Sequence, residues 1–166
     1  MTCLSRVAMF LLVAASAATA GGDTENDRQS LKGLEGVGVV VEDLEAEVEQ
    51  GGLNTTSIRT DVELKLRQAG ITVLTEAEVL AAPGGPILHI NVSTVGGPLY
   101  AYFVGVELCQ DVRLDRDPSI RIFTAVTWSV GAVGTVGRSN LRDIRNSIKD
   151  HVDEFLNAYL SVNPKR

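Results

Sequence analysis

Two histidines and a glycine-rich segment are the first places to look for chemistry in this sequence. His89 and His151 are the only histidines of the 166-residue chain. An imidazole serves as a general base or a metal ligand only beside partner side chains at a suitable spacing. No such spacing surrounds either histidine, and the chain contains no GxSxG, HExxH or CxxC motif. We therefore expect both histidines at the surface, and we predict no catalytic residue, metal ligand or cofactor.

The glycine-rich segment 129–140, SVGAVGTVGRSN, lies between an expected strand and an expected helix. Its stretch 132–139 resembles a phosphate-binding loop only in part, because the first glycine is Ala132 and the essential lysine is Arg138. The sequence therefore does not predict nucleotide binding. A weaker prediction is a site for a simple anion at the helix start, made by Gly134, Gly137, Arg138 and Arg142. The alternative is a strand end that curls into a helix and binds nothing.

The N-terminus has the features of an export signal. Arg6 precedes the apolar run Val7–Ala18, which is shorter than the roughly 20 residues that span a bilayer. The run ends in the cleavage pattern Ala18-Thr19-Ala20. We predict a signal peptide over residues 1–20 and export to the periplasm or the medium. We expect no stable membrane insertion after cleavage, and no lipid anchor, because Cys3 precedes the apolar run.

Composition excludes further classes of function. The formal net charge of −6 is the wrong sign for a protein that binds nucleic acid or an anionic membrane. After cleavage Cys109 would be the only cysteine, so it is either buried and unreactive or forms an intermolecular disulfide.

Two segments predict amphipathic helices. The first runs to Ala69 after a cap by Asn54 or Thr55, and Gly70 ends it. The second is capped by Ser139, continues to about Leu160 and closes at Asn163-Pro164.

The expected strands show two kinds of pattern. The valine-rich segment 37–44 predicts a strand that is covered on both faces, and residues 71–74 predict a short one. Alternation of apolar and polar residues predicts antiparallel strands with one solvent-exposed face, at 87–95, 100–115 and 120–130. In the last of these we expect Ile122, Val126 and Trp128 to share the buried face.

These elements predict an α+β two-layer sandwich, with two helices on one face of a mostly antiparallel sheet in the order β-α-(β)-β-β-β-α. We expect a flexible tail over residues 21–36, followed by one domain over residues 37–163.

Several stretches resemble a group of short exported bacterial proteins of unknown function. They are GVVVEDL, IRTDVELKLRQAGI, VELCQDVRL, TAVTWSVGAVGTVG and LSVNP, and the resemblance runs over about Val37 to Pro164. The element order is also similar to that of small periplasmic envelope-assembly domains, such as the lipopolysaccharide-assembly lipoprotein and the N-terminal domain of the Tol propeller protein. This resemblance implies an envelope protein and carries over no catalytic residue.

We therefore expect a non-enzymatic binding or assembly module that contacts a protein partner through a sheet edge or the uncovered sheet face. The alternative is a small exported hydrolase or ligand carrier with a site near Gly131–Arg142. That alternative requires a pocket that brings a histidine within hydrogen-bond reach of a serine or a carboxylate. The sequence does not determine the oligomeric state.

Overall fold

The computed structural model describes residues 23–97 and 99–164, so the predicted signal peptide lies outside the described residues. Its elements, in chain order, are α1 (Glu25–Gln29), β1 (Gly36–Val41), α2 (Ala46–Gln50), α3 (Thr55–Ala69), β2 (Thr72–Val73), α4 (Glu76–Ala81), β3 (Ile87–Gly96), β4 (Leu99–Leu114), β5 (Asp117–Gly137), the 3₁₀ helix η1 (Arg138–Asp143) and α5 (Ile144–Val162).

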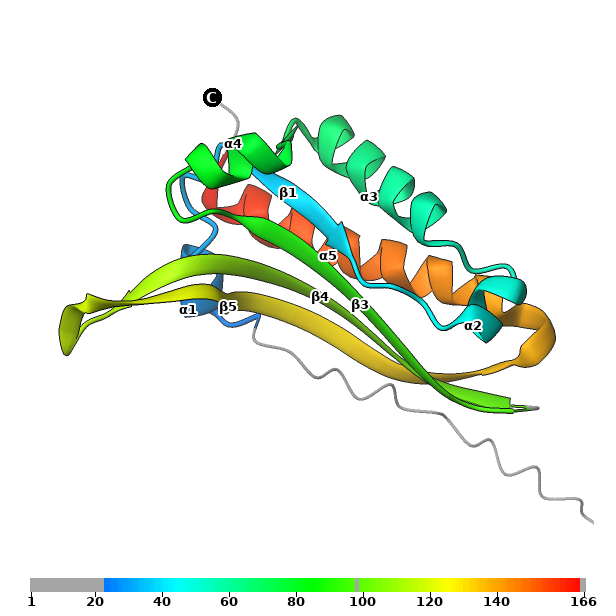
Figure 1. Ribbon diagram of the computed structural model, residues 1–166. Helices are drawn as coiled ribbons and strands as arrows, with labels where there is room; N and C mark the ends of the chain where they lie inside the picture. The colour runs from blue at the N-terminus through cyan, green and yellow to red at the C-terminus, as the bar shows by residue number, and fades with distance from the viewer. Residues whose placement is uncertain (1–22, 98, 165–166) are drawn as a thin grey trace, which may run out of the picture.

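The strands form one five-stranded mixed sheet in the order β2-β1-β3-β4-β5. β1 runs parallel to both β2 and β3, whereas β3, β4 and β5 follow one another antiparallel. Helices α3 and α5 cover one face, and the hairpin of β4 and β5 projects beyond them (Figure 1). The predicted α+β two-layer architecture is therefore confirmed, with a sheet that is mixed.

The core lies between this sheet and the two long helices. Alternate residues of β3 and β4 point toward the helices and are almost fully buried, as are Ile58, Val62 and Leu66 of α3 and Ile148, Val152 and Phe155 of α5. Trp128 of β5 meets Phe155 edge to face, with ring centroids 5.4 Å apart. Burying each such side chain contributes about 1.5–3 kcal/mol.

The boundaries of α3 match the prediction. The side chain of Asn54 accepts a hydrogen bond from the Ser57 amide, and Gly70 ends the helix in the left-handed conformation at φ 86°. A side chain would be strained at that φ, so glycine is the natural stop.

The start of the described chain differs from the expected flexible tail. Thr24 caps α1, and Leu31 is completely buried. The Asp23 carboxylate accepts hydrogen bonds from the Trp128 indole at 2.9 Å and from Arg28 at 2.7 and 2.8 Å. We call residues 23–34 the N-terminal strap, because they tie β5 to the end of α5.

The strap meets the other end of the chain through three hydrogen bonds. Asn163 donates its amide to the Leu31 carbonyl at 2.9 Å and accepts from the Gly33 amide at 2.8 Å. The Tyr159 hydroxyl donates to the Leu34 carbonyl at 2.9 Å. The first and last described segments therefore close against each other.

β5 departs from its prediction in two ways. It continues through the glycine-rich segment to Gly137, and its register against β4 shifts near Cys109. Trp128 lies opposite Leu108 while Val126 lies opposite Cys109, so the extra residue between them turns Val126 to the other face. The predicted shared buried face is therefore wrong, since Val126 is 52% exposed and Ile122 41%.

The final helix also begins differently. Gly137 is the N-cap of η1, with no side-chain cap, while the Ser139 hydroxyl donates to Asn140 at 3.2 Å. The predicted cap at Ser139 is wrong, because the chain first makes a 3₁₀ turn. The predicted end is confirmed, since Asn163 is the C-cap of α5.

Candidate functional site: an open strand edge

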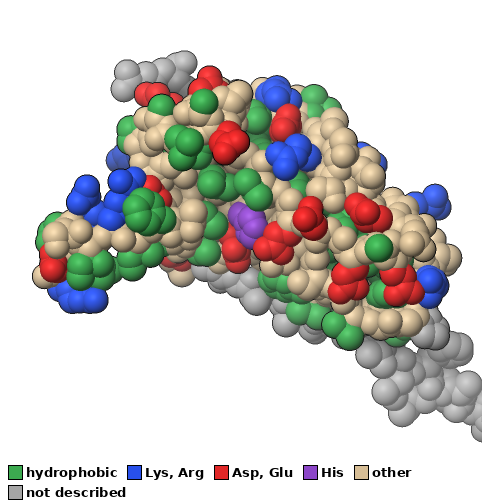
Figure 2. Space-filling model, viewed as in Figure 1, with side chains coloured by type: hydrophobic (Ala, Val, Ile, Leu, Met, Phe, Trp, Pro, Cys, Tyr) green, Lys and Arg blue, Asp and Glu red, His purple; other side chains and the backbone are tan. Residues whose placement is uncertain are grey.

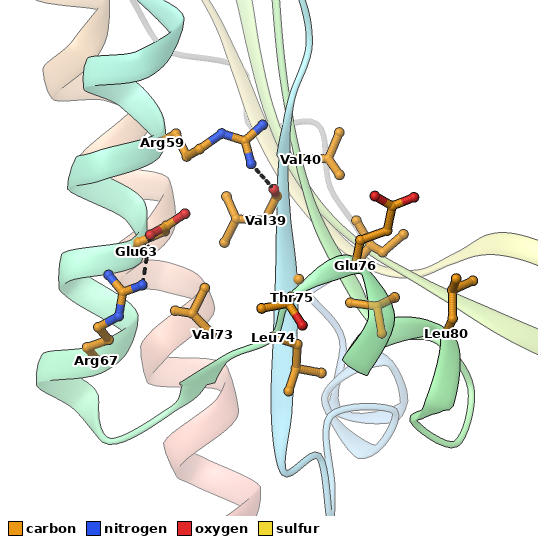
Figure 3. Close-up of a pocket in the computed structure, with 13 residues that line it drawn as sticks. Val39, Val40, Arg59, Glu63, Arg67, Val73, Leu74, Thr75, Glu76 and Leu80 are labelled. Carbon is orange, nitrogen blue, oxygen red and sulfur yellow. Dashed lines mark hydrogen bonds and ion pairs between the residues drawn. The ribbon is translucent and has the colours of Figure 1, made fainter.

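The most distinctive surface feature is a groove of about 620 Å³ at the β1 edge of the sheet. Figure 3 shows its two walls, with Arg59, Glu63 and Arg67 of α3 on one side of β1 and Glu76 and Leu80 of α4 on the other. The volume lies in the range typical of ligand sites.

The groove exists because β2 is too short to cover β1. β2 pairs only with Gly36 and Val37, and the Leu74 amide donates to the Val37 carbonyl at 2.9 Å before the chain turns into α4. The remainder of β1, Gly38–Val41, is therefore an edge strand.

The backbone of this edge faces the groove at alternate residues. The amides of Gly38 and Glu42 donate toward β3, to Pro86 and Ile90 at 3.0 Å. In a parallel ladder the backbone groups of the intervening residues face the opposite side. The N–H and C=O groups of Val39 and Val41 therefore point away from β3. Among the described residues, β1 pairs on this side only at Gly36 and Val37, and no backbone carbonyl outside the strand ladders accepts from the Val39 or Val41 amide.

Arg59 forms a hydrogen bond with one of the outward-facing backbone groups of this edge. Its guanidinium donates to the Val39 carbonyl at 2.6 Å, as Figure 3 shows. A side chain thus takes the position that an amide of a neighbouring strand would take. The next cation on the same wall, Arg67, is paired with Glu63 at 2.8 Å. Among the described residues, Arg59 has no carboxylate partner.

The opposite wall is helix α4, which was not predicted. Thr75 caps it, and the Glu78 carboxylate accepts in return from the Thr75 amide at 2.7 Å. These hydrogen bonds, to the backbone and then to the hydroxyl of Thr75, lower the pKa of Glu78. The pattern Thr75-x-x-Glu78 is a capping-box signature that would have revealed this helix.

α4 sits directly against β1 because Gly38 lacks a side chain. A Cβ added there would lie 2.6 Å from Cγ2 of Val79, closer than atoms tolerate. The next residue, Leu80, is 81% exposed at the rim of the groove. This wall therefore combines the apolar side chains of Val79 and Leu80 with the carboxylate of Glu76, whereas the α3 wall carries charged side chains of both signs.

His89 lies on the uncovered sheet face, in a hollow of about 400 Å³ that shares Val40 and Ile87 with the groove. Its Nε2 is 3.2 Å from a Glu42 oxygen and its Nδ1 is 3.7 Å from a Glu107 oxygen. Figure 2 shows a histidine with acidic side chains beside it on this face. Carboxylates therefore come within reach of His89, as the hydrolase alternative requires. In the described chain, however, no hydrogen bond joins its ring to a hydroxyl or thiol.

Cys109 lines the same hollow and is a free thiol, only 9% exposed. Burial, and then the nearby charge of Glu107, raise the pKa of this thiol. Because the thiolate is the reactive form, these surroundings favour an unreactive cysteine.

His151 contradicts its predicted surface position, since it is only 6% exposed on the inner side of α5. Its Nδ1 lies 2.6 Å from the Ser147 carbonyl one turn earlier. This contact gives its polar ring a partner inside the fold.

The predicted anion-site residues lie near the junction of β5 and η1. Gly134 faces the Tyr102 ring, where an added Cβ would come within 2.5 Å, so packing explains this glycine. Gly137 precedes η1, and Arg138 pairs with Glu47 of α2 at 2.8 Å. Arg142 is exposed on η1. The anion site stays a prediction.

No group of three or more His, Cys, Asp or Glu side chains in residues 23–97 and 99–164 is placed to hold a metal ion. No helix in this part of the chain is both long and apolar enough to cross a membrane.

Comparisons with protein-family models, with curated proteins and with solved structures each return no match. The resemblance to exported bacterial proteins therefore stays a prediction.

Proposed function

We propose that this protein is a non-enzymatic binding module that holds an extended segment of another polypeptide beside β1. The segment adds to the sheet as a further strand, along the line that β2 leaves after Val73. Residues 1–20 favour a place of action in the cell envelope or outside the cell.

One observation carries the proposal, namely the outward backbone of Val39 inside a two-walled groove, with that of Val41 further along the same strand edge. An exposed edge offers donors and acceptors at the spacing of a strand, and such edges bind extended peptides in many proteins. A strand advances about 3.3 Å per residue, so about five residues cover this edge and fit between the walls.

A direct test is amide hydrogen exchange measured by NMR, with the peptide acetyl-Thr-Val-Gln-Val-Thr-amide as the probe. We expect the Val39 and Val41 amides to exchange at least about tenfold more slowly near saturation, because the added strand accepts their hydrogen bonds. Unchanged exchange at both amides contradicts the proposal.

Two N-methylated peptides form the matched control. One carries methyl groups on both Val amides and the other on the Gln and final Thr amides. Alternate amides of an added strand face β1, so only one of the two peptides should lose binding. With the central Gln opposite Val39, the Val amides face β1 in a parallel pair and the Gln amide faces β1 in an antiparallel pair. The peptide that loses binding therefore also reports the direction of the added strand. Equal affinity of the two contradicts strand addition.

A further inference from the structure

The two walls of the groove impose different chemistry on alternate residues of an added strand. The residue opposite Val39 has its side chain on the same face as Val39, toward α3. Its neighbours on either side point the other way, toward Val79 and Leu80 of α4.

β2 already follows this rule, which supports the assignment of the faces. Val73, paired with Val37, packs against the core, whereas Thr72, paired with Gly36, is exposed. The next inward-facing position along the same line is the one opposite Val39.

Arg59 is the charged group on the wall that this position faces and touches Val39 itself, while Glu76 lies on the opposite, α4 wall. It now donates to the Val39 carbonyl, and an incoming strand would replace it there with a backbone amide. The displaced guanidinium would then lie beside the inward-facing side chain of the ligand. The other charges of the α3 wall, Glu63 and Arg67, neutralise each other at 2.8 Å, so the wall keeps one unpaired positive charge.

We infer that the groove selects strands that carry an acidic side chain opposite Val39, flanked by apolar residues toward α4. This inference rests on the proposed strand addition and names the class of peptide that the groove binds. Arg59 has two roles in it, since it satisfies the Val39 carbonyl in the free protein and pairs with the ligand carboxylate in the complex.

The test compares three peptides that differ only at the central residue of acetyl-Thr-Val-X-Val-Thr-amide, with X as Glu, Gln or Lys. Calorimetry should give the Glu peptide about three- to fivefold higher affinity than the Gln peptide, the size expected for a partly exposed ion pair. The Lys peptide should bind more weakly than the Gln peptide.

Charge reversal at Arg59 provides the matched control. In Arg59→Glu the order should invert, with the Lys peptide binding most tightly, whereas a purely structural role of Arg59 would weaken all three peptides alike. Arg59 is exposed, so the variant should fold, and its circular dichroism and melting curve check this. Arg59→Gln, which removes the charge, should erase the preference.

The outcomes separate the two proposals. If the peptides bind equally and protect the Val39 and Val41 amides, strand addition stands and the acidic preference is wrong. If no peptide protects these amides, both proposals are wrong. An unchanged preference for Glu in Arg59→Glu overturns the role of Arg59.

Discussion

Asp61 shows how a single carboxylate can join the two long helices. It lies on α3, and both of its oxygens accept hydrogen bonds from Arg145 of α5, at 2.5 and 2.7 Å. Lys149, one turn further along α5, is 3.0 Å away. The Arg145 hydrogen bonds, followed by Lys149, hold the pKa of Asp61 below its usual range despite partial burial.

Asp61→Asn should lower the free energy of unfolding at pH 7 by about 1–2 kcal/mol, because charge-assisted hydrogen bonds are lost. The folded-state pKa lies below the unfolded value of about 4, so the stabilisation is present above pH 4 and is lost as the pH falls through the folded pKa. Urea denaturation should therefore show the difference shrinking from pH 7 toward pH 2.

Glu63→Gln serves as the control, because Glu63 pairs with Arg67 within one helix at the surface. We expect a change of only about 0.3–0.5 kcal/mol at pH 7. A loss as large as that of Asp61→Asn would show that the link between α3 and α5 is not what stabilises the fold.

Single residues of the site were the hardest to predict from the sequence. The anion-site candidates at 134–142 follow from glycines and arginines that lie close together in the sequence. Arg59 has no such signal, since its role comes from the Val39 carbonyl, 20 residues away, and only the fold brings the two together. The polar side chain of His151 predicted a surface position, but His151 lies beside the buried Ile148 and Val152 on the inner face of α5.

At the scale of elements, the β4–β5 hairpin contains a strained position. Thr124 has φ 53°, a conformation that a β-branched residue adopts only at a cost. It lies within a register shift of β5 against β4, between the pairs Gln110–Ala125 and Val112–Ile122, where its amide donates to Asp111 at 3.3 Å. The backbone there is fixed by the pairing on either side.

Thr124→Gly should raise the free energy of unfolding by about 0.5–1 kcal/mol, since glycine adopts positive φ without the steric cost. Chemical denaturation measures this directly. Thr135→Gly, at an exposed and regularly paired position of β5, should instead lower it by about 0.5–1 kcal/mol. A destabilised Thr124→Gly would contradict the assigned strain.

Elements with complete local signals were predicted well. α3 has an Asn cap, an apolar stripe and a terminal glycine, and its bounds follow from these alone. The bulge near Cys109 was invisible, because alternation on both sides of it is regular and only the pairing with β4 reveals the extra residue. The opening of the groove was equally hidden, because it depends on where β2 stops pairing with β1.

At the scale of the whole molecule, the N-terminal strap completes the core. Leu31 is 0% exposed, and the segment around it bonds to β5 and to the end of α5. A polar composition predicted a tail here, because the one buried leucine gives no periodic pattern. The hydrogen-bond partners of the strap on β4, β5 and α5 lie 80 or more residues away.

Leu31→Ala should lower the free energy of unfolding by about 2–5 kcal/mol, the usual cost of an emptied leucine site in a core. Leu80→Ala is the matched control, because that leucine is 81% exposed and its loss should change stability by no more than about 0.5 kcal/mol. Thermal melts of both variants measure the difference. Equal melting temperatures would show that the strap does not seal the core.

The closure of the strap on Asn163 has a consequence for how the chain is made. Its contacts join residues 130 and 132 positions apart, so they can form only after the ribosome has made the chain as far as Asn163. Pairings so distant in sequence form slowly, because a long loop must close first. The strap therefore stays unbonded to the end of α5 until that helix has left the ribosome.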